Sequence, residues 1–334
     1  IVKKLFEEDS IDLFIGFQKG TVPLKSRPLF IDAQDKYRDE KIGTLTWDSF
    51  CTNNLAVFLP KYYQPDPNRR KGQEAPKPRI GLTVKGCDQR SVITLIKEKQ
   101  VPREQVVLIG VPCEGMIDKR KVEERLEGED EILSVEEKDN GTLLIKTREG
   151  KERELDREDV LRDACLDCRF PMPEQTDQLL EGEARKPGDG GYERIKEFQK
   201  KSRDERWDYF RQEFEKCIRC NACRQACPTC YCKECFAEQQ DMGWIGVTTE
   251  LTDTMIFHLI RVFHQAGRCV ECDACYSACP ENVDLRTLTK KLVMDVEELF
   301  GYIPDFSVET VPPLSTFKDE DPEGFITDPD KTDK

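Results

Sequence analysis

Two runs of cysteines share one spacing, and they are the residues of this chain best suited to chemistry. Each run reads Cys-x2-Cys-x2-Cys-x3-Cys-Pro. Three thiolates separated by two residues let one loop wrap an iron–sulfur cubane, and the fourth cysteine reaches a neighbouring cubane. The spacing therefore predicts two 4Fe-4S clusters with exchanged fourth ligands. The expected ligands are Cys217, Cys220, Cys223 and Cys279 at site 1, and Cys269, Cys272, Cys275 and Cys227 at site 2.

Zinc is the alternative metal for cysteines at this spacing. A structural zinc site is closed by four ligands. A zinc site does not need the third and fourth cysteines of each run. The pattern therefore favours iron–sulfur clusters over a zinc-stabilised scaffold.

The composition limits the remaining classes of protein. The 334 residues contain 16 cysteines, which are bunched at metal-ligand spacings rather than spread as a disulfide framework. This distribution of cysteines predicts that the protein resides in a reducing compartment, the cytoplasm. The net charge of −14 argues against a nucleic-acid surface, and no apolar run approaches the roughly 18 residues that span a bilayer.

The first half of the chain has the pattern of an α/β domain with a parallel sheet, over residues 1–180. A buried strand is predicted at 12–17 and a helix at 47–59, which Pro60 would end. The clearest unit is a strand at 79–84, a helix at 88–99 and a strand at 105–111, which should form a right-handed crossover between parallel strands.

This unit brings further thiols toward one edge of the sheet. Cys87 and Cys113 each follow the carboxyl end of a strand, where open α/β folds bind their ligands. Cys165 and Cys168 lie in a later loop. These four cysteines could hold a third cluster, at site 3. The alternative is that Cys87 and Cys113 are ordinary buried thiols.

The other segments differ in composition. Residues 121–159 are charged, with Asp139-Asn140-Gly141 between alternating stretches, and predict a surface β-hairpin insertion. Residues 181–191 are a linker by composition. Residues 192–300 should form a helical two-cluster ferredoxin domain, with helices at 192–216 and 249–266. The 301–334 segment is an extended tail, which we expect to be ordered on another surface, either that of its own chain or, as the favoured alternative, that of a partner.

The motifs of the first half resemble those of the beta subunits of coenzyme-F420-reducing hydrogenases and related formate dehydrogenases. The resemblance implies a 4Fe-4S cluster beside a flavin, with ligands supplied by KGCDQ (Cys87), GVPCEG (Cys113) and CLDC (Cys165 and Cys168). The Ser-Gly-Gly run that those subunits use for flavin has no counterpart here, so FAD remains an open alternative. Residues 205–300 resemble the helical ferredoxin domains of heterodisulfide reductase C and succinate dehydrogenase iron–sulfur subunits.

Four cysteines lie outside these three sites. Cys230, Cys232 and Cys235 form a dense Cys-x-Cys-x2-Cys run, which we name site 4. One hypothesis is a fourth cluster, completed by Cys51 or by a ligand other than cysteine. The alternative is that all four are reduced structural thiols.

These features predict an iron–sulfur electron-transfer subunit of an anaerobic multi-subunit redox complex. It would relay single electrons between a flavoprotein partner and a hydrogenase, formate dehydrogenase or heterodisulfide-reductase-like subunit. The alternative is a flavin-containing beta subunit that itself reduces deazaflavin or a nicotinamide. Since neither a GxGxxG nor a GxxxxGK[ST] motif is present, no catalytic residue is assigned and the clusters carry the predicted chemistry.

Overall fold

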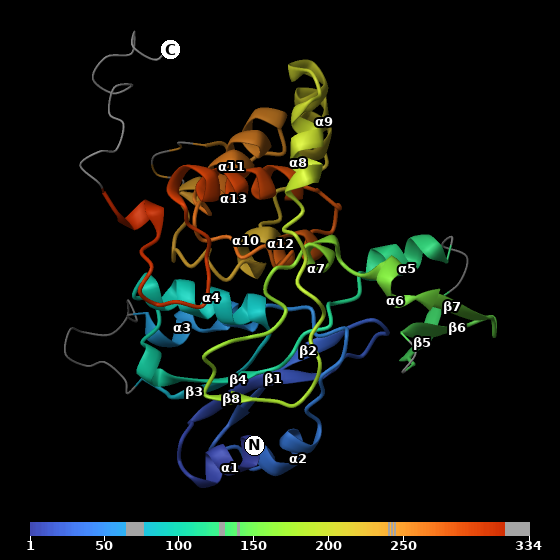
Figure 1. The fold of residues 1–334 in the computed structure, drawn as a ribbon, viewed down its shortest axis with the longest axis vertical. Helices are drawn as coiled ribbons and strands as arrows, with labels where there is room; N and C mark the ends of the chain where they lie inside the picture. Colours follow the sequence, from blue (N-terminus) through green and yellow to red (C-terminus); the bar gives the residue numbers. More distant parts are fainter. Residues whose placement is uncertain are drawn as a thin grey trace.

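A five-stranded sheet underlies the first half of the molecule, with helices on both faces (Figure 1). The computed structural model describes residues 1–64, 77–126, 131–138, 141–239, 241, 243 and 245–317. The strand order is β2-β1-β3-β4-β8; β2 is antiparallel to β1, and the other neighbours are parallel. The strands are β1 (Leu13–Lys19), β2 (Ser26–Asp32), β3 (Ile80–Val84), β4 (Val106–Gly110) and β8 (Gln178–Leu179). The predicted β3–helix–β4 unit with parallel strands is confirmed.

Both faces of the sheet are buried, which explains the continuous apolar run in β1. Neighbouring side chains of a strand point to opposite faces. Phe14 packs with residues of α1 (Val2–Glu7), whereas Ile15 packs on the side of α4 (Gly86–Lys97). α2 (Arg38–Gly43) lies on the same side as α1 (Figure 1).

The prediction of a helix at 47–59 is wrong. The segment holds only a 3₁₀ turn, η1 (Leu55–Phe58), because the Asn54 side chain accepts a hydrogen bond from the Ala56 amide and begins the helical turn there. Pro60 then begins α3 (Pro60–Tyr63) instead of ending a helix, as suits proline in a first turn.

A second, smaller sheet occupies the charged segment. Its strands β5 (Ile132–Glu137), β6 (Thr142–Thr147) and β7 (Glu152–Asp156) are antiparallel in the order β5-β6-β7. The strands thus number three where a two-stranded hairpin was predicted, because a turn at Gly150, with φ of 78°, returns the chain once more. Residues 139 and 140 of the predicted turn lie outside the described residues. The flanking helices are α5 (Lys119–Arg125), α6 (Arg157–Val160) and α7 (Asp163–Leu166).

The second half is helical. Its helices are α8 (Tyr192–Gln199), α9 (Arg203–Glu215), α10 (Ala222–Ala226), η3 (Phe236–Glu238), α11 (Leu251–Phe263), α12 (Ala274–Ser277) and α13 (Arg286–Phe300). The single helix predicted at 192–216 is two helices, because Ser202 and Glu205 form a capping box that starts α9. Within the described residues, no helix is long and apolar enough to cross a membrane.

α4 lies between the sheet and the helical half (Figure 1). Its Arg90 donates a hydrogen bond to the Val270 carbonyl at 3.2 Å. The chain after α13 returns to α4, where the Lys97 ammonium is 3.3 Å from the Tyr302 hydroxyl and 2.7 Å from the Thr310 hydroxyl. The first part of the predicted tail, which includes the 3₁₀ turn η4 (Pro313–Ser315), therefore contacts its own chain. Residues 318–334 lie outside the described residues.

Candidate iron–sulfur sites

The loops of sites 1 and 2 have the same unusual backbone. The residues on either side of each middle cysteine are left-handed: Arg219 and Asn221 have φ of 55° and 59°, and Glu271 and Asp273 have φ of 59° and 55°. Residues other than glycine rarely adopt this backbone conformation, although Asn and Asp tolerate it better than most. Two such residues bend each loop sharply before a short helix, α10 or α12. The repeated sequence motif is thus also a structural repeat.

The four predicted ligands of site 1 line one cavity, and hydrogen bonds reach two of their sulfurs. The Arg219 amide donates to the Cys217 sulfur at 3.4 Å, and the Val283 amide donates to the Cys279 sulfur at 3.4 Å. Donors of this kind favour thiolates. The residues at the cavity are Cys217, Cys220, Cys223 and Cys279, together with Cys275, His258 and Arg261.

One histidine, His258, lines the cavity of site 1. Its Nε2 lies 3.2 Å from the Cys217 sulfur. Burial, with smaller contributions from two nearby arginines, lowers the pKa of His258 to about 3, so the imidazole is neutral at physiological pH. With its proton on Nε2 it donates to the sulfur. Sequence reasoning missed this residue, since only the fold brings α11 over the first cysteine loop.

The predicted ligands of site 2 also share a cavity, which is lined by Cys227, Cys269, Cys272 and Cys275. Cys227 follows the site 1 loop in sequence, yet it lies with the thiols of the second loop, as Cys279 lies with those of the first. Burial raises the pKa of Cys272 to about 12, so iron must displace its proton. The neighbouring Cys230 thiol lowers the pKa of Cys227, and the Cys230 amide donates a hydrogen bond to the Cys227 carbonyl at 3.2 Å.

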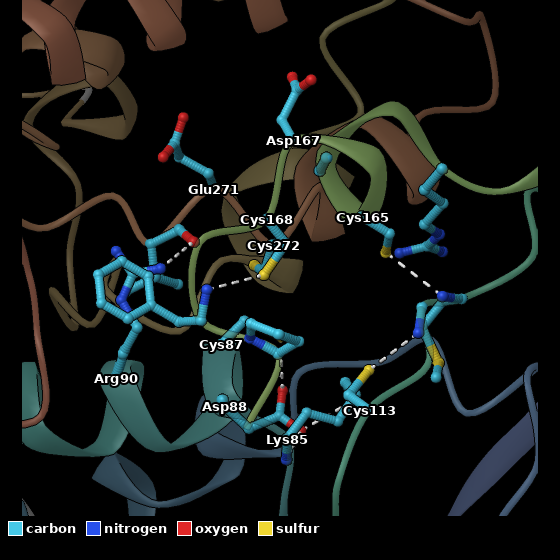
Figure 2. A pocket seen from close by; sticks show the side chains of 18 of the residues that line it. Lys85, Cys87, Asp88, Arg90, Cys113, Cys165, Asp167, Cys168, Glu271 and Cys272 are labelled. Carbon is cyan, nitrogen blue, oxygen red and sulfur yellow. Dashed lines mark hydrogen bonds and ion pairs between the residues drawn. The ribbon is translucent and has the colours of Figure 1, made fainter. Parts of the chain in front are cut away.

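The four predicted ligands of site 3 surround a third cavity, which Figure 2 shows from close by. Cys87 stands in the first turn of α4 and Cys113 follows β4, at the carboxyl edge of the sheet. Cys165 belongs to α7, and Cys168 to the loop after it. Backbone amides donate to three of these sulfurs: Gly115 to Cys113 at 3.4 Å, Met116 to Cys165 at 3.3 Å and Phe170 to Cys168 at 3.4 Å.

Close backbone contacts fold the Cys165–Cys168 loop over the sheet. A Cβ atom on Gly86 would stand 1.9 Å from the Phe170 carbonyl oxygen, so only glycine permits this approach. The segment predicted as a linker contributes as well, because the Gly188 amide donates to the Cys168 carbonyl at 2.6 Å and Arg185 lines the cavity. The linker is therefore part of the wall of site 3.

The charges around site 3 suit an anionic group. The lining residues include six basic side chains, those of Lys85, Arg90, Arg162, Arg169, Arg185 and Lys290, and three acidic ones, those of Asp88, Asp167 and Glu271. Lys85 is paired with Asp88 at 2.8 Å, and both are almost fully buried. Arg90 is only 3% exposed, and its Nη2 finds no hydrogen-bond partner in the described part of the chain. A cluster held by four thiolates would supply the missing negative charge, so the residues present fit this cofactor.

The structure separates Cys51 from the other cysteines of the predicted fourth site. Cys230, Cys232 and Cys235 line one cavity. Cys51 is instead fully buried in the core of the α/β domain, where its thiol contacts the Asp48 carboxylate at 3.3 Å. Burial raises its pKa to about 12. Cys51 is thus a core residue and cannot complete site 4. Within the described ranges, no three His, Cys, Asp or Glu side chains are grouped to hold a single metal ion.

Comparison with known proteins agrees with this arrangement. Residues 213–283, which span both cysteine runs, match the 4Fe-4S dicluster domain family. The F420-dependent formate dehydrogenase subunit beta of Methanocaldococcus jannaschii is 25% identical over an alignment of 368 residues that covers 94% of this chain and 92% of that protein. The F420-dependent formate dehydrogenase 1 subunit beta of Methanococcus maripaludis is 23% identical, with coverage of 94% and 91%.

A solved structure of the F420-reducing NiFe hydrogenase complex from Methanosarcina barkeri contains a chain that aligns with a TM-score of 0.35 and 15% identity, over 52% of this chain and 58% of that one. The sequence matches to the two curated relatives show that, over nearly its whole length, the protein is similar in sequence to beta subunits of F420-dependent formate dehydrogenases.

Proposed function

We propose that this chain is the iron–sulfur electron-transfer subunit of a multi-subunit redox complex, with 4Fe-4S clusters at sites 1, 2 and 3. Clusters of this type accept and release single electrons. The thiols named above would hold them, and the amide donors and His258 would tune their potentials through hydrogen bonds to sulfur.

The observation that carries this proposal is that neighbouring cavities share cysteines. Cys272 lines the cavities of sites 2 and 3, and Cys275 lines those of sites 1 and 2. Clusters held there would form a row in the order site 3, site 2, site 1. Site 3 lies at the edge of the sheet and site 1 among helices of the second half, so the row would lead from the α/β domain into the helical half.

The relatives suggest what the partner subunits are. Both are beta subunits of F420-dependent formate dehydrogenases. We infer that one partner is a formate dehydrogenase catalytic subunit, or a hydrogenase or heterodisulfide-reductase-like subunit in its place, and that the other is a flavoprotein. The complex would work anaerobically in the cytoplasm.

The test is the iron, sulfide, zinc and flavin content of anaerobically purified protein. At least about 12 iron per chain without flavin supports the relay, and redox titration followed by EPR should then resolve at least three one-electron centres. Iron well below that number, or zinc in its place, would refute the proposal.

A second candidate is a subunit that binds FAD and itself reacts with a deazaflavin or a nicotinamide. It is favoured by the names of the two relatives, which describe them as F420-dependent. One flavin released per chain on denaturation, together with reduction of a deazaflavin by the isolated chain, would select this candidate over the simple relay.

A further inference from the structure

The cavity of site 4 has the thiols and the basic side chains that an iron–sulfur cluster requires. Three thiols, those of Cys230, Cys232 and Cys235, reach it from one short loop just before η3. The space at this cavity, open solvent included, is about 450 Å³, which is similar to the 570 Å³ at site 1.

The charges at this cavity require an anion. Its lining includes Arg224, Arg261 and Arg268 but no Asp or Glu side chain. Arg224 and Arg268 are balanced from outside the lining by Glu238 and Glu98. Arg261 is 8% exposed, and its Nε has no hydrogen-bond partner among the described residues. It lines the cavities of sites 1 and 4, and the thiols that face it are Cys230 of site 4 and Cys223, Cys275 and Cys227 of sites 1 and 2. An unpaired buried charge is costly, so a thiolate-bound anionic group is the fitting occupant.

A fourth ligand is available on α11. His264 follows the last turn of this helix, lines the cavity and packs its ring against Phe236 at a centroid distance of 5.5 Å. Imidazole can replace cysteine as a ligand of cluster iron. The two histidines of the chain thus serve neighbouring sites, since His258 contacts the first cysteine of site 1.

We propose that site 4 holds a fourth 4Fe-4S cluster, ligated by the thiolates of Cys230, Cys232 and Cys235 and by the imidazole of His264. The inference rests on the proposed iron–sulfur function. It adds a fourth cluster beside the row of sites 3, 2 and 1, and so a side branch to the electron path. The Cys230 amide donates a hydrogen bond to the carbonyl of Cys227, a ligand of site 2, at 3.2 Å, and Thr229 lines both cavities, so a cluster at site 4 would lie beside the middle of the row.

The test compares iron, zinc and EPR spectra of the whole chain with those of Cys232→Ala and Cys235→Ala. Wild-type protein should contain about 16 iron, and each variant should lose about four iron and one EPR signal. Cys51→Ala is the matched control: it removes a cysteine that lies outside every site and should keep the wild-type iron content. Both variants spare Cys230, which contacts site 2, so the signals of sites 1 to 3 should remain and report that the chain is folded.

Two results would overturn the fourth cluster: unchanged iron in both variants, or the loss of one zinc instead of four iron. Wild-type protein with about 12 iron would also reject it while leaving the three-cluster relay intact. His264 is tested separately. His264→Cys should keep all the iron and change the spectrum of this cluster, and His264→Ala should lose iron; an unchanged iron content and spectrum in His264→Ala would show that His264 is not a ligand.

Discussion

Cys87 and Cys272 line the same cavity, although the first stands in the first turn of α4 and the second belongs to the helical half (Figure 2). Each is also a predicted ligand of a different cluster. The two halves of the chain therefore meet at a cluster site, and the packing between them sets how closely sites 2 and 3 approach.

Gly86→Ala should remove the cluster of site 3. The added Cβ would stand 1.9 Å from the Phe170 carbonyl oxygen, which would push away the loop that carries Cys165 and Cys168. We expect the purified variant to contain about four fewer iron atoms per chain. Gly43→Ala, at the end of α2 with nothing within 4 Å of the new atom, is the control and should keep them. Full iron content in Gly86→Ala would show that the loop can shift without opening the site.

The exchange of fourth ligands predicts opposite effects for two serine variants. Cys227→Ser should disturb the cluster of site 2, because Cys227 lies with the thiols of the second loop, and should spare site 1. Cys279→Ser should do the reverse. EPR of the two reduced proteins would reveal which signal changes. If each variant disturbs the cluster bound by its own run, the ligands are not exchanged.

Arg261→Gln should lower the reduction potentials of the nearest clusters. The buried guanidinium lies among thiols of Cys223, Cys275 and Cys230, and a positive charge favours the reduced, more negative cluster. A factor of ten in a one-electron equilibrium corresponds to about 59 mV, so a shift on the order of 50 mV is expected in a potentiometric titration. Arg211→Gln, which removes a surface charge paired with Glu215 on α9, should leave the potentials unchanged. Equal potentials in wild type and Arg261→Gln would rule out this electrostatic role.

Lys85→Met should strongly destabilise the α/β domain. It leaves the Asp88 carboxylate, which is fully buried, without its ion-pair partner, and breaking such a pair costs about 3–5 kcal/mol of unfolding free energy. The double variant Lys85→Met, Asp88→Leu should recover part of the loss. Lys119→Met, which breaks an exposed pair with Glu123, should cost about 0–1 kcal/mol in the same denaturant titration. If Lys85→Met lost as little unfolding free energy as Lys119→Met, water would have to reach the Asp88 carboxylate.

The sequence predicted the features that depend on local spacing. The two cysteine runs are local patterns, and the strands on either side of α4 follow from apolar runs and the turn at Gly86. The helix predicted at 47–59 failed because the side chain of Asn54 and the position of Pro60 outweigh the apolar pattern.

Contacts between distant segments could not be predicted in this way. Nothing local to Cys272 indicates that it also borders site 3, and nothing local to Cys51 separates a core thiol from a ligand. His258 and Arg261 acquire their places only when α11 packs over the cysteine loops.

The wall of site 3 has a consequence for the order in which the protein acquires iron. The cavity is lined by the edge of the sheet, the Cys165–Cys168 loop, the 181–191 segment and the loop of Cys272. Asp163, Ala164 and Asp167 of the first half also line the cavity of site 2, whereas the cavity of site 1 is lined by residues of the helical half alone. Maturation should therefore begin in that half, and the last cubane should be sealed in only when the two halves dock.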